Sequence, residues 1–207
     1  MCANFQIEIT DPRMMEIMKA ALKTSDALED DFSLLIKNKG EVFPAYTVPV
    51  QTAAETFRPM TWGFPRWKGT GVIFNARSED AMGEKSMFRD SMLRRRCVIS
   101  AFKYYEHKTE GKHKTKYFFQ LPGKGIMYLA GCWRMESGKR LPVCTILTRD
   151  AAGDLADIHN RMPVIIPPER VDEWLVESSE PMKQPTLWLD FGPVCPEEPA
   201  QMSFFDA

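Results

Sequence analysis

Residues 97–121 read CVISAFKYYEHKTEGKHKTKYFFQL. Two runs rich in aromatic and β-branched residues, CVISAFKYYEH and KYFFQL, lie on either side of a lysine-rich stretch that contains one glycine. Such runs, bounded by turn residues and charge clusters, predict strands, and KYYEHKTEGKHKTKYFF at residues 103–119 predicts a β-hairpin with a lysine-rich tip. The lysines of the tip are either a solvated loop or a surface that follows a phosphate backbone.

Similar strand-like runs lie on both sides of this hairpin, and fewer helical patterns lie around them. The expected strands are FQIEI, MTWGF, VIFNA, IMYLAGCWRM, VCTILT and MPVII. The expected helices are PRMMEIMKAALK, FRDSMLRRR and PPERVDEWLVES, with a short one in DAAGDLADIH. Strands dominate the middle of the chain, which predicts an α+β domain with a curled, mostly antiparallel sheet and peripheral helices.

The composition is typical of one folded domain. Of 207 residues, 44% are hydrophobic and 27% are charged, which suffices for a single buried core. We expect a domain over residues 1–190 and a flexible, Pro- and Glu-rich tail over residues 191–207. No apolar run has the roughly 18 to 20 residues of a membrane helix, and the N-terminal sequence lacks the apolar region of a secretory signal. A monomeric, cytoplasmic protein without membrane contact is therefore expected.

Charge and cysteine usage narrow the function classes further. Residues 150–207 hold 12 acidic and 3 basic side chains, whereas residues 1–149 hold 16 acidic and 24 basic ones. A basic body of this kind is able to bind a polyanion despite a net charge of -1, and a solvated surface without a partner is the alternative. The five cysteines contain no C-x-x-C pair, so neither a zinc cluster nor a disulfide framework is indicated. We expect no metal and no organic cofactor.

Cys2 differs from the other cysteines in its surroundings. Cys97, Cys132 and Cys144 lie in apolar stretches, where a small buried side chain is the expected role. Cys2 directly follows Met1. Removal of Met1 would give one residue that carries both a free amine and a thiol.

Two further residues are candidates for proton transfer. His159 lies between an expected helix end and a buried strand, with Arg161 two residues on. It is either a histidine that stabilises a turn or a proton donor beside an anion site. Glu106 ends an apolar run, and it is either an ordinary strand end or a general base whose proton affinity is raised by desolvation.

A second group of residues is suited to binding a nucleic acid. Asn75 and Arg77 alternate along an expected strand, so their side chains share a face and together present an amide and a guanidinium. Trp62 and Trp67 flank a Gly-Pro turn. They are either core residues or exposed aromatics that stack on a single strand.

These stretches, in this order, resemble the SRAP (SOS response-associated peptidase) family of abasic-site-shielding proteins. The matching segments are MC at the start, MTWGFPRW, NARSE, FRDSMLRRRCVISAFKYYEH, AGCW, TILT and IHNRMPVII. They extend from residue 2 to about residue 175. The resemblance implies a barrel-like SRAP fold and a function in DNA repair and the SOS response.

The resemblance also implies a reaction. After loss of Met1, the amine and thiol of Cys2 would capture the aldehyde of a ring-opened abasic site in single-stranded DNA as a thiazolidine crosslink. Glu106 would act as the base, His159 would supply a proton during ring opening, and Asn75 would orient Cys2 and the sugar. Arg77 and Arg161 would hold the flanking phosphates, while Trp67 and Trp62 would contact the strand. Such a protein would lie on the nucleoid when bound to DNA.

Two other functions use the same residues. One is a cysteine autopeptidase or N-terminal-nucleophile amidohydrolase, in which Cys2 attacks a peptide or amide carbonyl. The other is a single-stranded DNA-binding module without covalent chemistry. The sequence departs from the family at its start, where MCANF replaces the usual M-C-G-R-F and Asn4 stands in place of an arginine.

The end of the chain carries a separate expectation. QMSFF at residues 201–205 resembles the short Q-L-x-L-F peptides that dock on bacterial sliding clamps. Gln201, Met202, Phe204 and Phe205 would be its anchors. The alternative is a frayed end with incidental phenylalanines.

Overall fold

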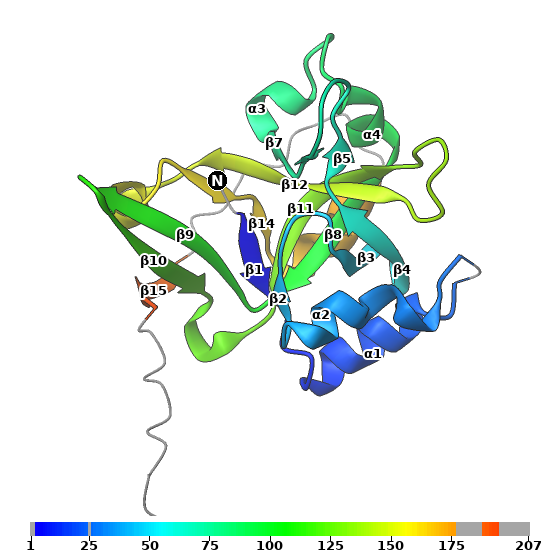
Figure 1. Ribbon diagram of the computed structural model, residues 1–207, viewed down its shortest axis with the longest axis horizontal. Helices are drawn as coiled ribbons and strands as arrows, with labels where there is room; N and C mark the ends of the chain where they lie inside the picture. The colour runs from blue at the N-terminus through cyan, green and yellow to red at the C-terminus, as the bar shows by residue number, and fades with distance from the viewer. Residues whose placement is uncertain (1–2, 25, 177–187, 195–207) are drawn as a thin grey trace, which may run out of the picture.

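The computed structural model describes residues 3–24, 26–176 and 188–194 (Figure 1). The helices are α1 (Pro12–Ala21), α2 (Ser33–Lys37), α3 (Ser78–Ala81), α4 (Arg89–Arg94) and α5 (Val171–Leu175), with 3-10 turns η1 (Glu29–Phe32), η2 (Pro122–Lys124), η3 (Gly153–Asp157) and η4 (Pro168–Arg170). The strands are β1 (Asn4–Gln6), β2 (Glu41–Val42), β3 (Thr47–Ala53), β4 (Thr56–Trp62), β5 (Phe64–Pro65), β6 (Val72–Ile73), β7 (Asn75–Arg77), β8 (Arg96–Ala101), β9 (Lys103–Glu110), β10 (His113–Gln120), β11 (Met127–Arg134), β12 (Val143–Asp150), β13 (Arg161–Pro163), β14 (Ile165–Ile166) and β15 (Asp190–Pro193).

The larger sheet curls into a closed ring. Its strand order is β13-β12-β4-β3-β8-β11-β14, and β11 also pairs with β12. This second pairing joins residues 131–134 to residues 143–146 and closes β12, β4, β3, β8 and β11 into a ring. β12 pairs in parallel with β4 and with β7, whereas the other pairs of this sheet are antiparallel. Closure leaves these five strands with partners on both sides.

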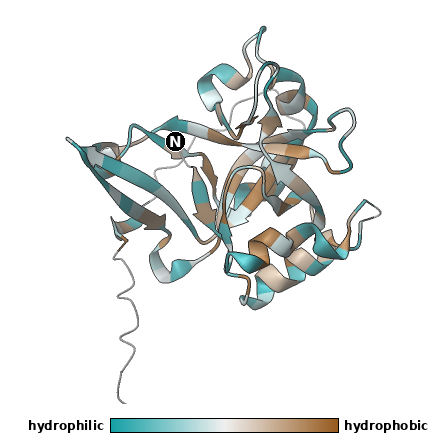
Figure 2. Cartoon of the chain, viewed as in Figure 1, coloured by the Kyte–Doolittle hydropathy of each residue, from teal (hydrophilic) through white to brown (hydrophobic). Residues whose placement is uncertain are grey.

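The smaller sheet has the order β15-β10-β9-β1-β2 and is antiparallel throughout. The chain passes from the ring into this sheet at Phe102, whose main-chain N–H donates to the oxygen of Gln6 at 2.7 Å. Figure 1 shows β9 and β10 as a hairpin that extends away from the ring. The outer half of this hairpin is hydrophilic, whereas apolar residues gather on the central strands (Figure 2).

Helix α1 illustrates how local sequence and packing agree. The Asp11 carboxylate accepts the main-chain N–H of Met14 at 2.9 Å, and Pro12 occupies the first turn, where its missing N–H has no cost. Met14, Ile17 and Ala21 are buried at helical spacing, and they face β3 and β4. The helix therefore covers one side of the ring.

The apolar side chains form two clusters. The first joins the ring to α1 and to the smaller sheet, and the second lies where α4 and α5 pack on β8 and β11. The first includes Phe5, Met14, Trp62, Tyr104 and Phe119, and the second includes Phe64, Met92, Val98, Ala130 and Trp174. No helix within the described ranges is long and apolar enough to cross a membrane.

The expected α+β class with a curled, mostly antiparallel sheet is confirmed, and four local expectations change. The run CVISAFKYYEH is two strands in two sheets, divided at Phe102, rather than one strand. The segment 150–159 contains the 3-10 turn η3 instead of a short α-helix, and β3 was not expected. β15 pairs with β10 through Pro193, so ordered pairing continues past the expected boundary at residue 190.

Candidate functional site

Glu106 and His159 come together between the two sheets. Along β9 the side chains of Tyr104 and Glu106 are buried, whereas His107 is exposed, as the alternation of a strand requires. His159 lies between η3 and β13, two residues before Arg161, where β13 begins. Its Nε2 lies 3.8 Å from Oε2 of Glu106, and the whole Glu106 residue is only 4% exposed. Two proton-transferring groups from distant parts of the chain therefore meet in a desolvated place.

The surroundings shift both pKa values towards the neutral forms. Burial raises the pKa of the Glu106 carboxyl to about 7. Burial also lowers the pKa of the His159 imidazole from its ordinary value. Both shifts favour the uncharged forms, so they argue against a strong ion pair at 3.8 Å.

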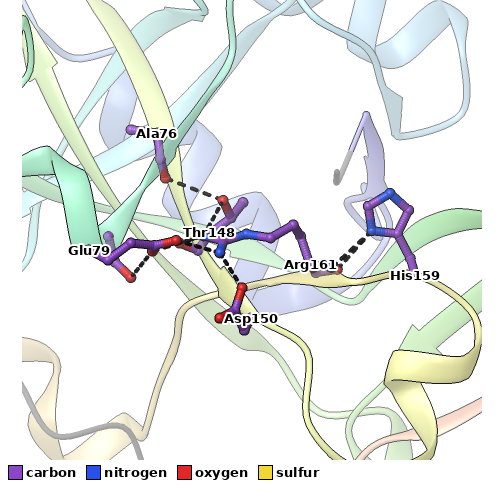
Figure 3. A network of polar contacts seen from close by, with 7 residues as sticks. Ala76, Glu79, Thr148, Asp150, His159 and Arg161 are labelled. Atoms are coloured by element: carbon purple, nitrogen blue, oxygen red, sulfur yellow. Dashed lines mark hydrogen bonds and ion pairs between the residues drawn. The ribbon is translucent and has the colours of Figure 1, made fainter.

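The ring nitrogen Nδ1 of His159 is held by the main chain of Arg161. The Arg161 N–H donates to Nδ1 at 3.0 Å, and the Arg161 carbonyl oxygen lies 3.3 Å from the same nitrogen (Figure 3). Because a backbone N–H only donates, the shorter contact makes Nδ1 an acceptor in the neutral ring. The proton of the neutral ring is then on Nε2, the nitrogen that faces Glu106.

The strand β7 carries Asn75 and Arg77 and lies beside β12. Asn75 is paired with Ile146 and Arg77 with Thr148. Ala76 between them is buried, whereas Asn75 is half-buried and Arg77 is exposed. The two expected site residues therefore share a face, as their spacing predicted.

Trp62 and Trp67 differ completely in exposure. Trp62 has no exposed surface, and its indole N–H donates to the oxygen of Phe74 at 2.9 Å. The expected contact of Trp62 with a DNA strand is therefore wrong, because a side chain inside the core has no face for a base. Trp67 is 94% exposed beside Arg66 and Arg134, so stacking on a base remains a prediction for this residue.

The guanidinium of Arg161 is turned inward instead of towards solvent. It contacts Glu79 through two bonds, at 2.5 and 2.9 Å, and Asp150 at 2.6 Å. Nη2 also donates to the oxygen of Thr148 at 2.7 Å, and the side chain is 7% exposed. The expected contact of Arg161 with a phosphate is therefore corrected, because both terminal nitrogens of its guanidinium already donate to carboxylates in this structure.

The start of strand β1 is fixed next to Glu106. Asn4 is paired with Tyr105, the residue directly before Glu106. The Asn4 amide donates to Glu41 at 2.5 Å, and Lys116 contacts the same Glu41 oxygen at 2.6 Å. These contacts anchor the start of β1.

Some expected residues lie outside the described ranges. Cys2 and the tail residues Gln201, Met202, Phe204 and Phe205 belong to them. The cysteines that are described, Cys97, Cys132 and Cys144, are buried, and burial raises the pKa of each thiol. They are therefore poor nucleophiles. Within residues 3–24, 26–176 and 188–194, no group of three His, Cys, Asp or Glu side chains is arranged to hold a metal ion.

Comparison with known sequences identifies the family. The family model described as SOS response associated peptidase (SRAP) matches residues 1–194. The chain belongs to the SRAP family. The match extends beyond the segments 2–175 on which the resemblance rested, and it includes β15.

Curated SRAP relatives are similar over the same region. Abasic site processing protein YoqW of Bacillus subtilis (strain 168) is 33% identical over 155 residues, which are 66% of this chain and 69% of the relative. YedK of Escherichia coli (strain K12), also an abasic site processing protein, is 32% identical over 120 residues, or 56% of this chain and 54% of YedK. Abasic site processing protein HMCES of Gallus gallus is 32% identical over 173 residues, which cover 65% of this chain and 51% of HMCES.

Solved structures share the fold. A protein from Bacteroides thetaiotaomicron has a TM-score of 0.71 at 18% identity, with 94% of this chain and 92% of that chain covered. A protein from Bordetella bronchiseptica has a TM-score of 0.67 at 20% identity, with 94% of this chain and 100% of that chain covered. At these identities the likeness concerns the SRAP fold alone.

The sequence did not indicate several residues that surround the site. Glu79, Asp150 and Thr148 hold Arg161, and Glu41 and Lys116 hold Asn4. Glu79 is the last residue of the motif NARSE, so its place beside Asn75 and Arg77 is a sequence signal for a role near the site. Thr148 and Asp150 lie on the same strand β12, and Thr148 ends the motif TILT, whereas Glu41 and Lys116 come from two other segments.

Proposed function

We propose that this protein captures abasic sites in single-stranded DNA through a thiazolidine bond to Cys2, and that it thereby shields the lesion during DNA repair. The observation that carries the proposal is the contact of His159 with Glu106, next to the start of β1. The names of the SRAP relatives, abasic site processing proteins, agree with this substrate.

Chain connectivity limits the distance between Cys2 and this pair of residues. Two residues span at most about 7 Å, so the Cα atom of residue 2 is within that distance of the Cα atom of Asn4. Asn4 is fixed beside Tyr105, one residue from Glu106. We propose that the amine and thiol of residue 2 reach the Glu106 carboxyl within this limit.

The proposed chemistry begins at the free amine. The amine of Cys2 attacks the aldehyde carbon of the ring-opened deoxyribose, and loss of one water gives an imine. The thiol then adds to the imine carbon while its proton goes to the nitrogen, which closes a five-membered thiazolidine. Overall, one C–N and one C–S bond form at the same carbon and one water leaves. Holding these groups together lowers the barrier through proximity.

Glu106 and His159 supply the proton transfers. An α-ammonium group has a pKa of about 8, and a carboxylate with a pKa of about 7 is well matched to accept its proton. The imidazolium of His159 gives its Nε2 proton to the sugar ring oxygen as the ring opens. The remaining Nδ1–H then has the Arg161 carbonyl oxygen, 3.3 Å away, as its acceptor.

Binding of the strand would depend on exposed groups around this centre. Arg77 shares a face of β7 with Asn75, so a phosphate at Arg77 would bring the sugar close to the Asn75 amide. Trp67 offers an exposed ring on which a base stacks. Arg161 is left out of this binding surface because its guanidinium contacts Glu79 and Asp150.

The SRAP family description names a peptidase, which favours a second activity of the same residues. In this candidate function, Glu106 and His159 assist attack of Cys2 on the bond after Met1, so that the protein frees its own terminus. Mass measurement of Glu106→Gln made without cellular aminopeptidases tests it. Retention of Met1 in this variant and its loss in the unchanged protein would support self-removal. Equal loss of Met1 in both would contradict it.

The central test is intact mass spectrometry before and after exposure to a single strand with one abasic site. The expected adduct has the mass of the protein without Met1 plus the strand minus one water. Cys2→Ala is expected to give no adduct. A strand with a tetrahydrofuran in place of the abasic sugar is the matched control, since it has the same shape but opens to no aldehyde.

Two outcomes would contradict the proposal. One is a mature protein that retains Met1 and still forms the adduct. The other is a protein that binds the abasic strand reversibly and shows no increase in mass, which would favour the DNA-binding module without covalent chemistry.

A further inference from the structure

We infer that Glu79 is a positioning residue for His159 and that it acts through Arg161. The inference rests on the proposed function, since it assigns the residue that keeps the proton donor of that site in place. Glu79 has no contact with the reacting atoms in this scheme. Its effect is on the geometry and the tautomer of the imidazole.

The first step is the clamp on the Arg161 side chain. Both Glu79 carboxylate oxygens contact the guanidinium, at 2.5 and 2.9 Å, which is the bidentate geometry that fixes orientation as well as distance (Figure 3). Asp150 and the oxygen of Thr148 complete the set at 2.6 and 2.7 Å. The guanidinium is nearly buried and has acceptors on several sides, which fixes the position of the Arg161 side chain.

The second step leads from Arg161 to the histidine. The main-chain N–H and the carbonyl oxygen of Arg161 both lie next to Nδ1 of His159, at 3.0 and 3.3 Å. The N–H stabilises the neutral ring with its proton on Nε2, and the carbonyl is the acceptor for a protonated Nδ1. A displacement of the main chain at Arg161 therefore changes which nitrogen carries the proton and where the ring points.

The third step concerns the two elements that the Glu79–Arg161 pair connects. It lies in α3, directly after the strand β7 that carries Asn75 and Arg77. Arg161 lies in β13, on the strand that follows His159. Both strands pair with β12, β7 in parallel and β13 antiparallel. The Glu79–Arg161 pair therefore connects the element that orients the substrate to the element that donates the proton.

The alternative is that Glu79 competes with DNA phosphates for Arg161. In that case removal of the carboxylate would free the guanidinium, tighten binding and steepen the salt dependence. The positioning role predicts the opposite pattern, with unchanged DNA affinity and slower chemistry. One variant therefore separates the two roles.

The experiment combines NMR of the free protein with crosslinking kinetics. The chain has three histidines, so the ring 15N signals of His159 can be assigned by comparison with His159→Gln. We expect the unchanged protein to show the Nε2–H tautomer at pH 8, and Glu79→Ala to show a mixture of tautomers. We also expect Glu79→Ala to crosslink about tenfold more slowly at saturating DNA, because a misplaced group loses about this much rate or more. Glu79→Gln retains an acceptor for Arg161 and is expected to restore most of both properties.

Glu173→Ala is the matched control. Glu173 of α5 also holds an arginine, Arg170 of η4, through two hydrogen bonds at 2.8 and 2.9 Å. It is expected to behave as the unchanged protein in both measurements. A Glu79→Ala protein with the unchanged tautomer, or with an unchanged rate and tighter binding, would overturn the inference. Should the unchanged protein form no crosslink at all, the proposed function fails, while the NMR measurement still decides the role of Glu79.

Discussion

At the scale of single residues, the site contains a buried carboxyl group, an arrangement that is unfavourable for folding. Glu106 is 4% exposed, and burial raises its pKa to about 7. An ionised carboxylate in such a place costs free energy, which stable proteins usually avoid. The same desolvation gives the carboxylate the proton affinity that a base needs near neutral pH.

Glu106→Gln is expected to stabilise the free protein above neutral pH. The pKa of about 7 in the folded state lies above the ordinary value of 4.5, so the free energy of unfolding falls as pH rises from about 4.5 to about 7, and the loss persists at higher pH. The amide removes this penalty and should raise the free energy of unfolding by about 1 to 3 kcal/mol at pH 8 and by almost nothing at pH 4.

Urea unfolding of both proteins at these two pH values measures the difference. Glu29→Gln, a change of an exposed carboxylate in η1, controls for the loss of one charge. A stabilisation of the same size at pH 4 and pH 8 would contradict the assigned origin. The stabilised Glu106→Gln protein should also crosslink more slowly.

Arg77→Ala is expected to weaken binding of every single strand, with or without a lesion. Arg77 is exposed, and one lost phosphate contact reduces the slope of log affinity against log salt by about 0.7 for a single strand. Fluorescence anisotropy at several salt concentrations measures this slope. Arg13→Ala, a change of a half-exposed arginine on α1, is the matched control. An unchanged slope for Arg77→Ala would remove this residue from the DNA-binding surface.

At the scale of elements, the site depends on strands that are held by buried aromatic side chains. Trp62 at the end of β4 packs edge-on against Phe5 of β1, with ring centroids 5.0 Å apart, and against Phe74 at 5.5 Å. Phe74 directly precedes Asn75, and Phe5 is three positions from Cys2. One core residue therefore supports both the strand of the proposed nucleophile and the strand of its orienting amide.

Trp62→Phe and Trp67→Ala are expected to have opposite effects. Trp62→Phe removes one of the two donors to the Phe74 oxygen, which keeps the Ile146 N–H at 3.1 Å, and it creates a cavity in the core. It should therefore lower the free energy of unfolding by about 2 to 4 kcal/mol and slow crosslinking. Trp67→Ala should leave stability within about 0.5 kcal/mol and weaken single-strand affinity by about 1 to 3 kcal/mol.

Denaturation and anisotropy measured on both variants distinguish the two roles. Weaker DNA binding by a folded Trp62→Phe protein with unchanged stability would contradict the core assignment. The pair thus tests whether exposure decides the role of each tryptophan.

At the scale of the whole molecule, the site lies where the closed ring meets the smaller sheet. β12 and its neighbours β7 and β13 carry Asn75 and the His159–Arg161 segment, and β9 and β1 carry Glu106 and Asn4. Since no single sheet carries all of these residues, the relative placement of both sheets decides the geometry. Ring closure between β11 and β12 is the feature that fixes β12.

Gly131→Ala tests the importance of ring closure. A Cβ atom at Gly131 would lie 2.5 Å from the main-chain oxygen of Thr145, which is on the partner strand and has no room to move. We expect a loss of at least about 2 kcal/mol in the free energy of unfolding, together with loss of crosslinking. Gly125→Ala is the control, because its Cβ would meet nothing closer than 3.9 Å. Equal stability of the two variants by thermal denaturation would contradict a tight closure.

Much of the fold could be predicted from the sequence because its strands are locally consistent. The hairpin of residues 103–119 was predicted from aromatic and β-branched runs around a charged turn, and β9 and β10 confirm it. The break at Phe102 could not be predicted, since the apolar run continues through it without a Gly or Pro. Only the pairing of β8 with the ring and of β9 with β1 divides the run.

The sequence by itself determined which chemical groups are available: a cysteine directly after Met1, an amide and a guanidinium on one strand face, a carboxyl after an apolar run, and a histidine before a buried strand. Periodicity fixes which of these share a face, because side chains alternate along a strand. Only the tertiary structure decided that Trp62 is a core residue and that Arg161 contacts Glu79 and Asp150. It also decided that His159 meets Glu106. Burial and contacts between distant segments depend on how the two sheets pack, and no local pattern encodes that packing.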